Sequence, residues 1–227
     1  LFALPMIAGN MLQQLYNIAD TLIVGRVLGS NALAAVGSAY TLMTFLTSIF
    51  LGLSMGSGAL FSIYLGKGDR ASLKSAIVHA FVLIMTVTLV LNVLVYACLN
   101  PILTFLQVPA EVWDGMRDYL LVIFAGLIAA SLYNFFSSLL RALGNSTAPL
   151  VFLAVSAVLN IGLDLLFVAV LPWGIQGAAL ATVIAQYVSG VGMTLYVLFR
   201  CRDLLPGRGE VHFSRPILKE ITNLSTL

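Results

Sequence analysis

The fold is decided by residues 148–171, which read APLVFLAVSAVLNIGLDLLFVAVL. Asp164 is the one charged residue in this stretch. About 20 apolar residues are enough for an α-helix to cross roughly 30 Å of hydrocarbon. The apolar side chains also lack the alternation of period two that marks a transmembrane β-strand. The stretch therefore predicts a membrane-spanning helix.

Five further apolar blocks of similar length occupy most of the remaining chain. The six predicted spans are roughly 2–25, 38–65, 75–99, 118–141, 148–171 and 177–200. Apolar residues make up 60% of the chain and charged residues 9%, against about 25% charged residues in a soluble domain. The sequence thus predicts an all-α membrane protein with a six-transmembrane-helix bundle. A net charge of +2 without a basic, aromatic-rich run argues against a nucleic-acid partner.

Most connections between the predicted spans are short. Residues 25–31, 66–70 and 144–149 carry the Gly, Asn and Pro content expected of turns between antiparallel helices. Residues 100–117 are longer and contain two prolines and Trp113, so we expect a short interfacial helix there.

Lys and Arg residues predict the orientation, because cytoplasmic loops retain positive charge. Nine of them follow the second, fourth and sixth spans, whereas only Arg26 and Arg117 follow the others. Both ends of the segment are therefore expected in the cytoplasm. Trp113 and Trp173 would then lie at the outer surface, where aromatic side chains favour the headgroup zone.

Asp20 and Asp164 are the only acidic residues away from the ends of the predicted spans, and Lys and Arg occur in them only at the last position, as Arg141 and Arg200. A charge at the bilayer centre costs on the order of 3 kcal/mol on insertion scales, so such residues usually mark an ion or proton pathway. Each aspartate follows a proline, Pro5 or Pro149, by fifteen positions. At about 1.5 Å per residue, both lie roughly 22 Å along their helices, at one depth. This spacing is either a weak internal repeat, as in many transporters, or a chance likeness of apolar helices.

Polar side chains accompany both aspartates on one helical face. The predicted cavity-lining residues are Asn10, Gln13 and Asn17 on the first span, Ser156 on the fifth and Gln186 on the sixth. Asn160 and Thr182 belong to the same two polar stripes on the fifth and sixth spans. The alternative interpretation is a set of interhelical hydrogen bonds, each worth about 0.6–2 kcal/mol.

Small and other polar residues at helical spacing are interpreted as helix packing. They are Gly177, Ala181, Ala185 and Ser189; Gly52, Gly56 and Gly58; and Ser131, Asn134 and Ser138. Two cysteines and two histidines form neither a disulfide framework nor a zinc pattern. We expect Cys98, Cys201, His79 and His212 to have structural roles.

Several stretches, taken together, resemble the multidrug and toxic compound extrusion (MATE) transporters. They are residues 4–5 (LP), 13–26 (QQLYNIADTLIVGR), 32–37 (ALAAVG), 66–69 (GKGD), 141–145 (RALGN), Asn160 with Asp164, and 174–182 (GIQGAALAT). They occur in the order and spacing of that family, nearly from end to end of the chain.

The resemblance implies one lobe of a twelve-helix exporter that is not an enzyme. Residues 1–200 would form the amino-terminal lobe, and 201–227 a cytoplasmic segment leading to a second lobe of the same polypeptide. The implied activity is antiport of H⁺ or Na⁺ against amphipathic, often cationic, organic compounds across a bacterial inner membrane. By the same resemblance Asp20, Asn160, Asp164 and Thr182 would form the cation site. No other cofactor or metal is implied, and the expected partners are a small-molecule substrate, membrane lipid and the second lobe.

Other functions remain open at this point. A flippase for lipid-linked oligosaccharides would need cationic residues in its cavity to hold pyrophosphate, and the interiors of the spans contain none. An intramembrane hydrolase could use two carboxylates as an aspartyl dyad, but neither aspartate lies in a context typical of cleavage. A non-transporting assembly subunit would tolerate loss of both aspartates. Neither the exported compound nor the choice between H⁺ and Na⁺ follows from the sequence.

Overall fold

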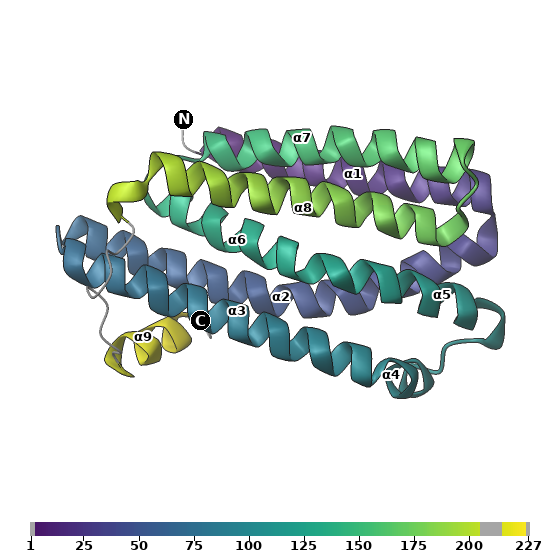
Figure 1. Cartoon of the computed structure of the whole chain (residues 1–227), viewed down its shortest axis with the longest axis horizontal. Helices are drawn as coiled ribbons and strands as arrows, with labels where there is room; N and C mark the ends of the chain where they lie inside the picture. The colour runs from purple at the N-terminus through teal and green to yellow at the C-terminus, as the bar shows by residue number, and fades with distance from the viewer. Residues whose placement is uncertain (1–2, 205–214, 226–227) are drawn as a thin grey trace.

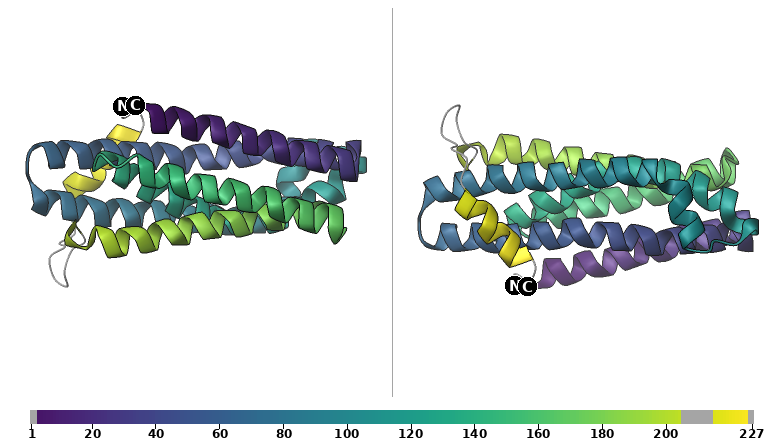
Figure 2. Two further views of the ribbon diagram at one scale, coloured as in Figure 1. Left: turned by 90° about the horizontal axis from the view of Figure 1, so that it is seen from above. Right: turned by 90° about the horizontal axis from the view of Figure 1, so that it is seen from below.

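The computed structural model describes residues 3–204 and 215–225 as an elongated bundle of roughly parallel and antiparallel helices, without strands (Figures 1 and 2). The α-helices are α1 (Ala3–Leu28), α2 (Ser30–Gly66), α3 (Arg70–Ala97), α4 (Leu99–Phe105), α5 (Ala110–Ile123), α6 (Leu127–Ala142), α7 (Thr147–Asp164), α8 (Gly174–Arg200) and α9 (Arg215–Ser225). Three short segments of other helical geometry are η1 (Phe124–Gly126), η2 (Leu165–Val170) and η3 (Arg202–Leu204).

Five helical segments in the described ranges are long and apolar enough to cross a membrane: α2, α3, α5 with α6, α7 with η2, and α8. The helix α1 has sufficient length, at 26 residues. Its mean hydropathy is lower because four amide side chains and Asp20 interrupt its apolar residues. The all-α membrane fold is confirmed, and α1 is the sixth long helix of the bundle, although it is not apolar enough to be counted with the five.

The first predicted turn is wrong in extent. Residues 25–31 were expected to form a loop, but α1 continues to Leu28 and α2 starts at Ser30. Gly29 alone joins them, with a φ of 87°, which a residue without a Cβ adopts at little cost. The second helix therefore begins eight residues before the predicted start at 38.

The fourth span differs from its prediction in two ways. Residues 100–117 hold the short helix α4, but α5 starts at Ala110 and continues into the span. The span is also interrupted at η1, where three side chains donate hydrogen bonds to backbone carbonyls. These are Asn92 to Phe124 (2.7 Å), Tyr96 to Leu121 (2.9 Å) and Tyr187 to Ala125 (3.0 Å). Side chains of α3 and α8 thus supply hydrogen bonds to backbone carbonyls at and just before the interruption.

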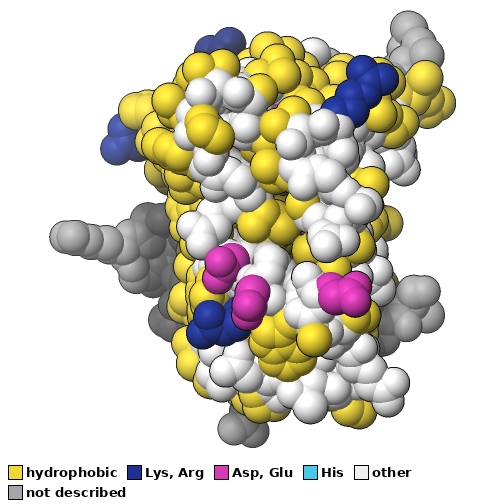
Figure 3. Space-filling model, turned by 90° about the vertical axis from the view of Figure 1, so that its right-hand side faces the viewer, with side chains coloured by type: hydrophobic (Ala, Val, Ile, Leu, Met, Phe, Trp, Pro, Cys, Tyr) yellow, Lys and Arg dark blue, Asp and Glu magenta, His cyan; other side chains and the backbone are white. Residues whose placement is uncertain are grey.

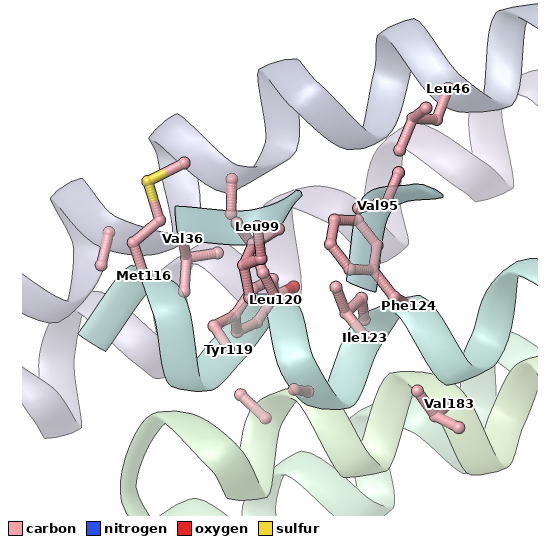
Figure 4. Packing of buried hydrophobic residues seen from close by; sticks show 14 of the residues in the cluster. Val36, Leu46, Val95, Leu99, Met116, Tyr119, Leu120, Ile123, Phe124 and Val183 are labelled. Atoms are coloured by element: carbon pink, nitrogen blue, oxygen red, sulfur yellow. The ribbon is translucent and has the colours of Figure 1, made fainter. Parts of the chain in front are cut away.

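Two apolar clusters hold the bundle together, one towards each end. The first joins α2, α3, α5 and α8 and includes Leu46, Val95, Leu120 and Phe124 (Figure 4). The second joins α2, α3, α6, α8 and α9 and includes Phe61, Ile84 and Phe135. The polar site described below lies between α1, α7 and α8, beside the first cluster.

The turn between α2 and α3 is capped by Asp69. The backbone N–H of Ser72 donates to its carboxylate at 3.0 Å, which satisfies one of the free N–H groups at the start of α3. The side-chain and backbone hydrogen bonds from Ser72 lower the pKa of Asp69. The predicted turn at 66–70 is confirmed, since only residues 67–69 lie outside the two helices.

The helix α9 packs against α2 and α3, as Figure 1 shows. Its Ile217 and Ile221 are buried in the second cluster, and the Tyr64 hydroxyl donates to Glu220 at 2.8 Å. At Gly56 an added Cβ would lie 2.6 Å from the backbone nitrogen of Ser225. The glycines of α2 therefore do serve close packing, and the partner at Gly56 is α9.

The opposite end of the bundle carries the start of α5 and the connection between α7 and α8. Acidic side chains gather there among mostly apolar and uncharged atoms (Figure 3). The acidic residues of α5 are Glu111, Asp114 and Asp118. Asp118 accepts a hydrogen bond from Gln176 at 3.1 Å, which ties α5 to the start of α8.

The remaining structural predictions have mixed outcomes. His79 is buried, with Nδ1 2.8 Å from the carbonyl oxygen of Ser75, which confirms a structural role. His212 lies outside the described residues. Cys98 and Cys201 are free thiols. On α8 the predicted small-residue stripe is buried throughout.

Candidate functional site

Asp20 and Asp164 approach each other in the interior of the bundle. Asp20 comes from α1 and Asp164 from the last position of α7, and α1 packs along α7. Their side chains are close enough to share a hydrogen bond when one of them carries a proton. Asp164 has no exposed surface, whereas Asp20 is partly accessible. The two aspartates of the predicted site thus form one pair of carboxyls.

Asn160 and Thr182 lie beside this pair and connect α7 to α8. The Asn160 Nδ2 donates to the Thr182 Oγ1 at 3.2 Å, and both side chains are buried. Tyr16 lies near both carboxyls and next to the Thr182 hydroxyl. All four residues of the predicted cation site are therefore brought together.

The oxygens of this cluster have few donors. Within the described part of the chain, Oδ1 of Asp20, Oδ1 of Asn160 and both carboxyl oxygens of Asp164 are buried without a hydrogen-bond partner. Burying a carboxylate in this way is costly unless a positive charge or a proton compensates it. Hard cations prefer such oxygen ligands. The site is therefore suited chemically to a proton or a hard cation.

The helix geometry changes directly after Asp164. Residues Leu165–Val170 form a π-helical segment, in which Leu171 N–H bonds to the Leu166 carbonyl at 2.8 Å. Such segments are rare and often occur at functional sites. The following turn is held by Trp173, whose ring stacks on Phe167 at 4.7 Å. Asp164 thus lies where the helical geometry changes, and the Phe167–Trp173 stack packs the turn that follows.

A cavity of about 680 Å³ adjoins the pair. It is lined by α1, α2, α5 and α8. Among the described residues, Asp20 is the one charged residue in its lining, and Asp164 does not line it. Gln13, Asn17, Thr182 and Gln186 line it as predicted. Its other polar residues are Gln14, Tyr16, Thr21, Tyr40, Thr44, Thr47 and Tyr119 (Tyr119 is labelled in Figure 4).

A second cavity of about 370 Å³ lies next to the first, between α1, α2, α6, α7 and α8. Ser156 lines it and donates to the Ala185 carbonyl at 2.9 Å. Asn134 also lines it, so this residue, which we interpreted as part of a packing seam, faces a cavity. Arg141 and Ser146 lie at its α6–α7 end. The side chain of Asn10 lies outside the described part of the structure.

Several cavity residues were missed by the sequence reasoning. Tyr40, Thr44 and Thr47 of α2 follow each other at helical spacing and could have been recognised as a polar stripe. Tyr16 lies one turn before Asp20 and shares its face. Tyr119 was not predictable, because only the packing of α5 against the core brings it towards the aspartates.

A family model described as MatE matches residues 5–166. The chain belongs to this family. The Probable multidrug resistance protein YpnP of Bacillus subtilis (strain 168) is 34% identical over 199 residues, which cover 87% of this chain and 44% of that protein. The FAD transporter of Shewanella oneidensis is 26% identical over 191 residues, which cover 82% of this chain and 42% of that protein.

The fold agrees with the MatE assignment. A solved structure, described as the outward-facing conformation of a multidrug resistance MATE family transporter of the MOP superfamily, gives a TM-score of 0.91 at 26% identity. The match covers 99% of this chain and 51% of that one, so the chain spans about half the length of its relatives. These findings confirm the resemblance to MATE transporters and the fold of one lobe. They also confirm an integral, multi-pass membrane protein of a transporter family rather than an enzyme.

Proposed function

We propose that this chain is the amino-terminal lobe of a cation-coupled antiporter that exports amphipathic organic compounds. The observation that carries the proposal is the Asp20–Asp164 pair, whose buried oxygens have no donors, beside a large cavity. The proposed coupling site is Asp20, Asn160, Asp164 and Thr182. Gln13, Asn17 and Gln186 would face the transported compound in the larger cavity.

Coupling would follow from competition between two occupants. A proton or Na⁺ between the carboxyls would draw α1 towards α7 and α8, because its ligands come from all three helices. An organic cation in the adjoining cavity would favour the form with the site empty and Asp20 ionised. A ligand shifts an equilibrium only through its different affinities for the two states, and these opposite preferences provide that difference.

The lining of the larger cavity supports a neutral or cationic compound. It holds three tyrosines and no Lys or Arg, and aromatic faces attract organic cations. One MatE relative is named as an FAD transporter, so membership of the family does not fix the charge of the compound. A flippase that holds pyrophosphate is less well supported. Among the residues that the structure describes, Arg141 is the only Lys or Arg that lines either cavity, and it lies at the far end of the smaller one.

A second lobe of the same polypeptide is part of the proposal. Alternating access requires one bundle to move against another around the site, and the relatives are about twice as long as the region matched. We further propose a bacterial inner membrane, with both ends of the segment in the cytoplasm and lipid around the exposed apolar side chains. No cofactor beyond the coupling ion is proposed, and no nucleic-acid partner.

The test is counterflow of a fluorescent cationic dye in proteoliposomes that contain the intact polypeptide. An imposed Na⁺ gradient and a pH gradient are compared, and each should be assayed in wild type, Asp20→Asn and Asp114→Asn. Asp114 is exposed on α5 and provides the same chemical change away from the site. We expect at least one gradient to drive dye transport in wild type and Asp114→Asn but not in Asp20→Asn. Transport that neither gradient accelerates would refute the antiport mechanism, and full activity of Asp20→Asn would leave a structural role for this residue.

A further inference from the structure

The two cavities follow each other along the bundle axis. On α1 the smaller cavity starts at Gly9 and the larger one ends at Leu22, a distance of about 20 Å at 1.5 Å per residue. The antiparallel α2 shows the reverse order, from Leu33 in the larger cavity to Leu51 in the smaller one. The smaller cavity therefore extends from the level of the carboxyl pair towards the α6–α7 end of the lobe.

Six side chains line both cavities and separate them: Gln13, Tyr16, Thr44, Thr47, Thr182 and Gln186. All six carry hydroxyl or amide groups, and none is charged or aliphatic. Polar groups of this kind can hold water in a buried passage.

The lining of the smaller cavity continues the polar path. Asn134, Ser156 and Ser189 lie along it from α6, α7 and α8, and Arg141 and Ser146 lie at its end. Arg141 is in the last turn of α6, where a positive charge interacts favourably with the helix carbonyls. It would also oppose the entry of cations, as positive groups do in selective pores.

The larger cavity opens elsewhere. Ile18 and Leu22 of α1 and Tyr40 of α2 line it and are half exposed, so it is accessible from the side of the lobe between α1 and α2. The carboxyl pair is thus adjacent to two polar spaces that lead in different directions.

We propose that the smaller cavity is a route within the lobe through which a small monovalent cation, H⁺ or Na⁺, moves between the Asp20–Asp164 pair and the α6–α7 end. The inference rests on the proposed function and adds to it a separate path for the cation. The organic compound uses the side opening between α1 and α2. Cation and compound can then exchange without passing each other.

The test uses a removable plug. In the intact polypeptide with Cys98→Ser and Cys201→Ser, Ser156→Cys places a thiol in the smaller cavity. The matched control is Val158→Cys on the same helix, where the side chain is 73% exposed. Both are modified with a methyl or a benzyl methanethiosulfonate. Equilibrium binding of H⁺ and of ²²Na⁺ is measured together with the rate of exchange after a jump in pH or Na⁺ concentration.

We expect the benzyl adduct at position 156 to slow cation exchange by about tenfold or more, an added barrier of about 1.4 kcal/mol, while equilibrium affinity stays within about twofold. Reductant should restore the rate, and the methyl adduct and both Val158→Cys adducts should have little effect. Arg141→Gln should accelerate exchange, which a purely structural role would not produce. An unchanged rate with the benzyl adduct, or a Ser156→Cys thiol that does not react, overturns the route alone. Absence of any cation binding that depends on Asp20 in the parent protein overturns the proposed function, and the route with it.

Discussion

The helices α1 and α7 each present one aspartate to the same site, but they hold it differently. Asp164 is fully buried, and Asn160 before it bonds across to α8. On α1 the Asn17 side chain, three residues before Asp20, donates to Gln14 on the same helix at 3.5 Å and has no bond to another helix among the described residues. Exposed Leu15 and Ile18 leave much of α1 without packing partners in the described structure.

The difference indicates that α7 and α1 have different roles in the site. α7 and α8 are joined by the buried hydrogen bond between Asn160 and Thr182 and by the hydrogen bond from Ser156 to the Ala185 carbonyl. α1 has fewer buried contacts, and such elements open at a lower free energy than the core. A cation held between the two aspartates would therefore act mainly on the position of α1.

The largest expected effect on export comes from removing the charge of the aspartate on α1 or of the one on α7. Asp20→Asn and Asp164→Asn should each preserve membrane insertion but lose gradient-driven export, by at least about tenfold in rate, equivalent to about 1.4 kcal/mol. Asp20→Asn should be the more damaging, because Asp20 alone connects α1 to the cation. Efflux and substrate binding are measured in parallel at matched expression. Normal efflux in both variants would show that the aspartates are only structural contacts.

Lengthening each carboxyl by one methylene would sharpen the comparison. Asp164 lies in a closed site, where an added methylene costs about 1–3 kcal/mol, whereas Asp20 lines a cavity with room for it. Thermal unfolding in detergent should show a clear loss of stability for Asp164→Glu and little change for Asp20→Glu. Equal melting temperatures of the two variants would contradict the proposed difference between the α7 and α1 sides of the site.

The last comparison concerns the two asparagines. Asn160→Leu removes the donor to Thr182 in a buried environment, and an unpaired buried group costs about 1–3 kcal/mol. Asn17→Leu breaks only a local contact at the cavity edge, so it should be nearly neutral for stability. Unfolding curves and cation affinity should both differ between the two variants. An equal loss of stability in both would argue against the difference between α7 and α1.

The two aspartates could be recognised from the sequence because each stands in a local apolar stretch, where the free-energy cost of burying a charge in the membrane is evident. The break at η1 could not, since the carbonyls of Leu121, Phe124 and Ala125 accept hydrogen bonds from Tyr96, Asn92 and Tyr187, which are distant in sequence. The turn at Gly29 was overestimated because Arg26 and Asn31 are typical loop residues that here remain helical. Asn134 was assigned to packing because a helical stripe does not reveal whether its neighbour is a helix or a cavity.

The contact between Gly56 and Ser225 constrains the order in which the lobe assembles. About 170 residues separate the two positions, and synthesis at about 5–20 residues per second takes roughly 10–30 s to cover them. During that interval α2 and α3 have been made, but α9 has not. Gly52 and Gly56 of α2 therefore lack their α9 partner while the other spans are inserted, and the docking of α9 is a late event in the assembly of this lobe.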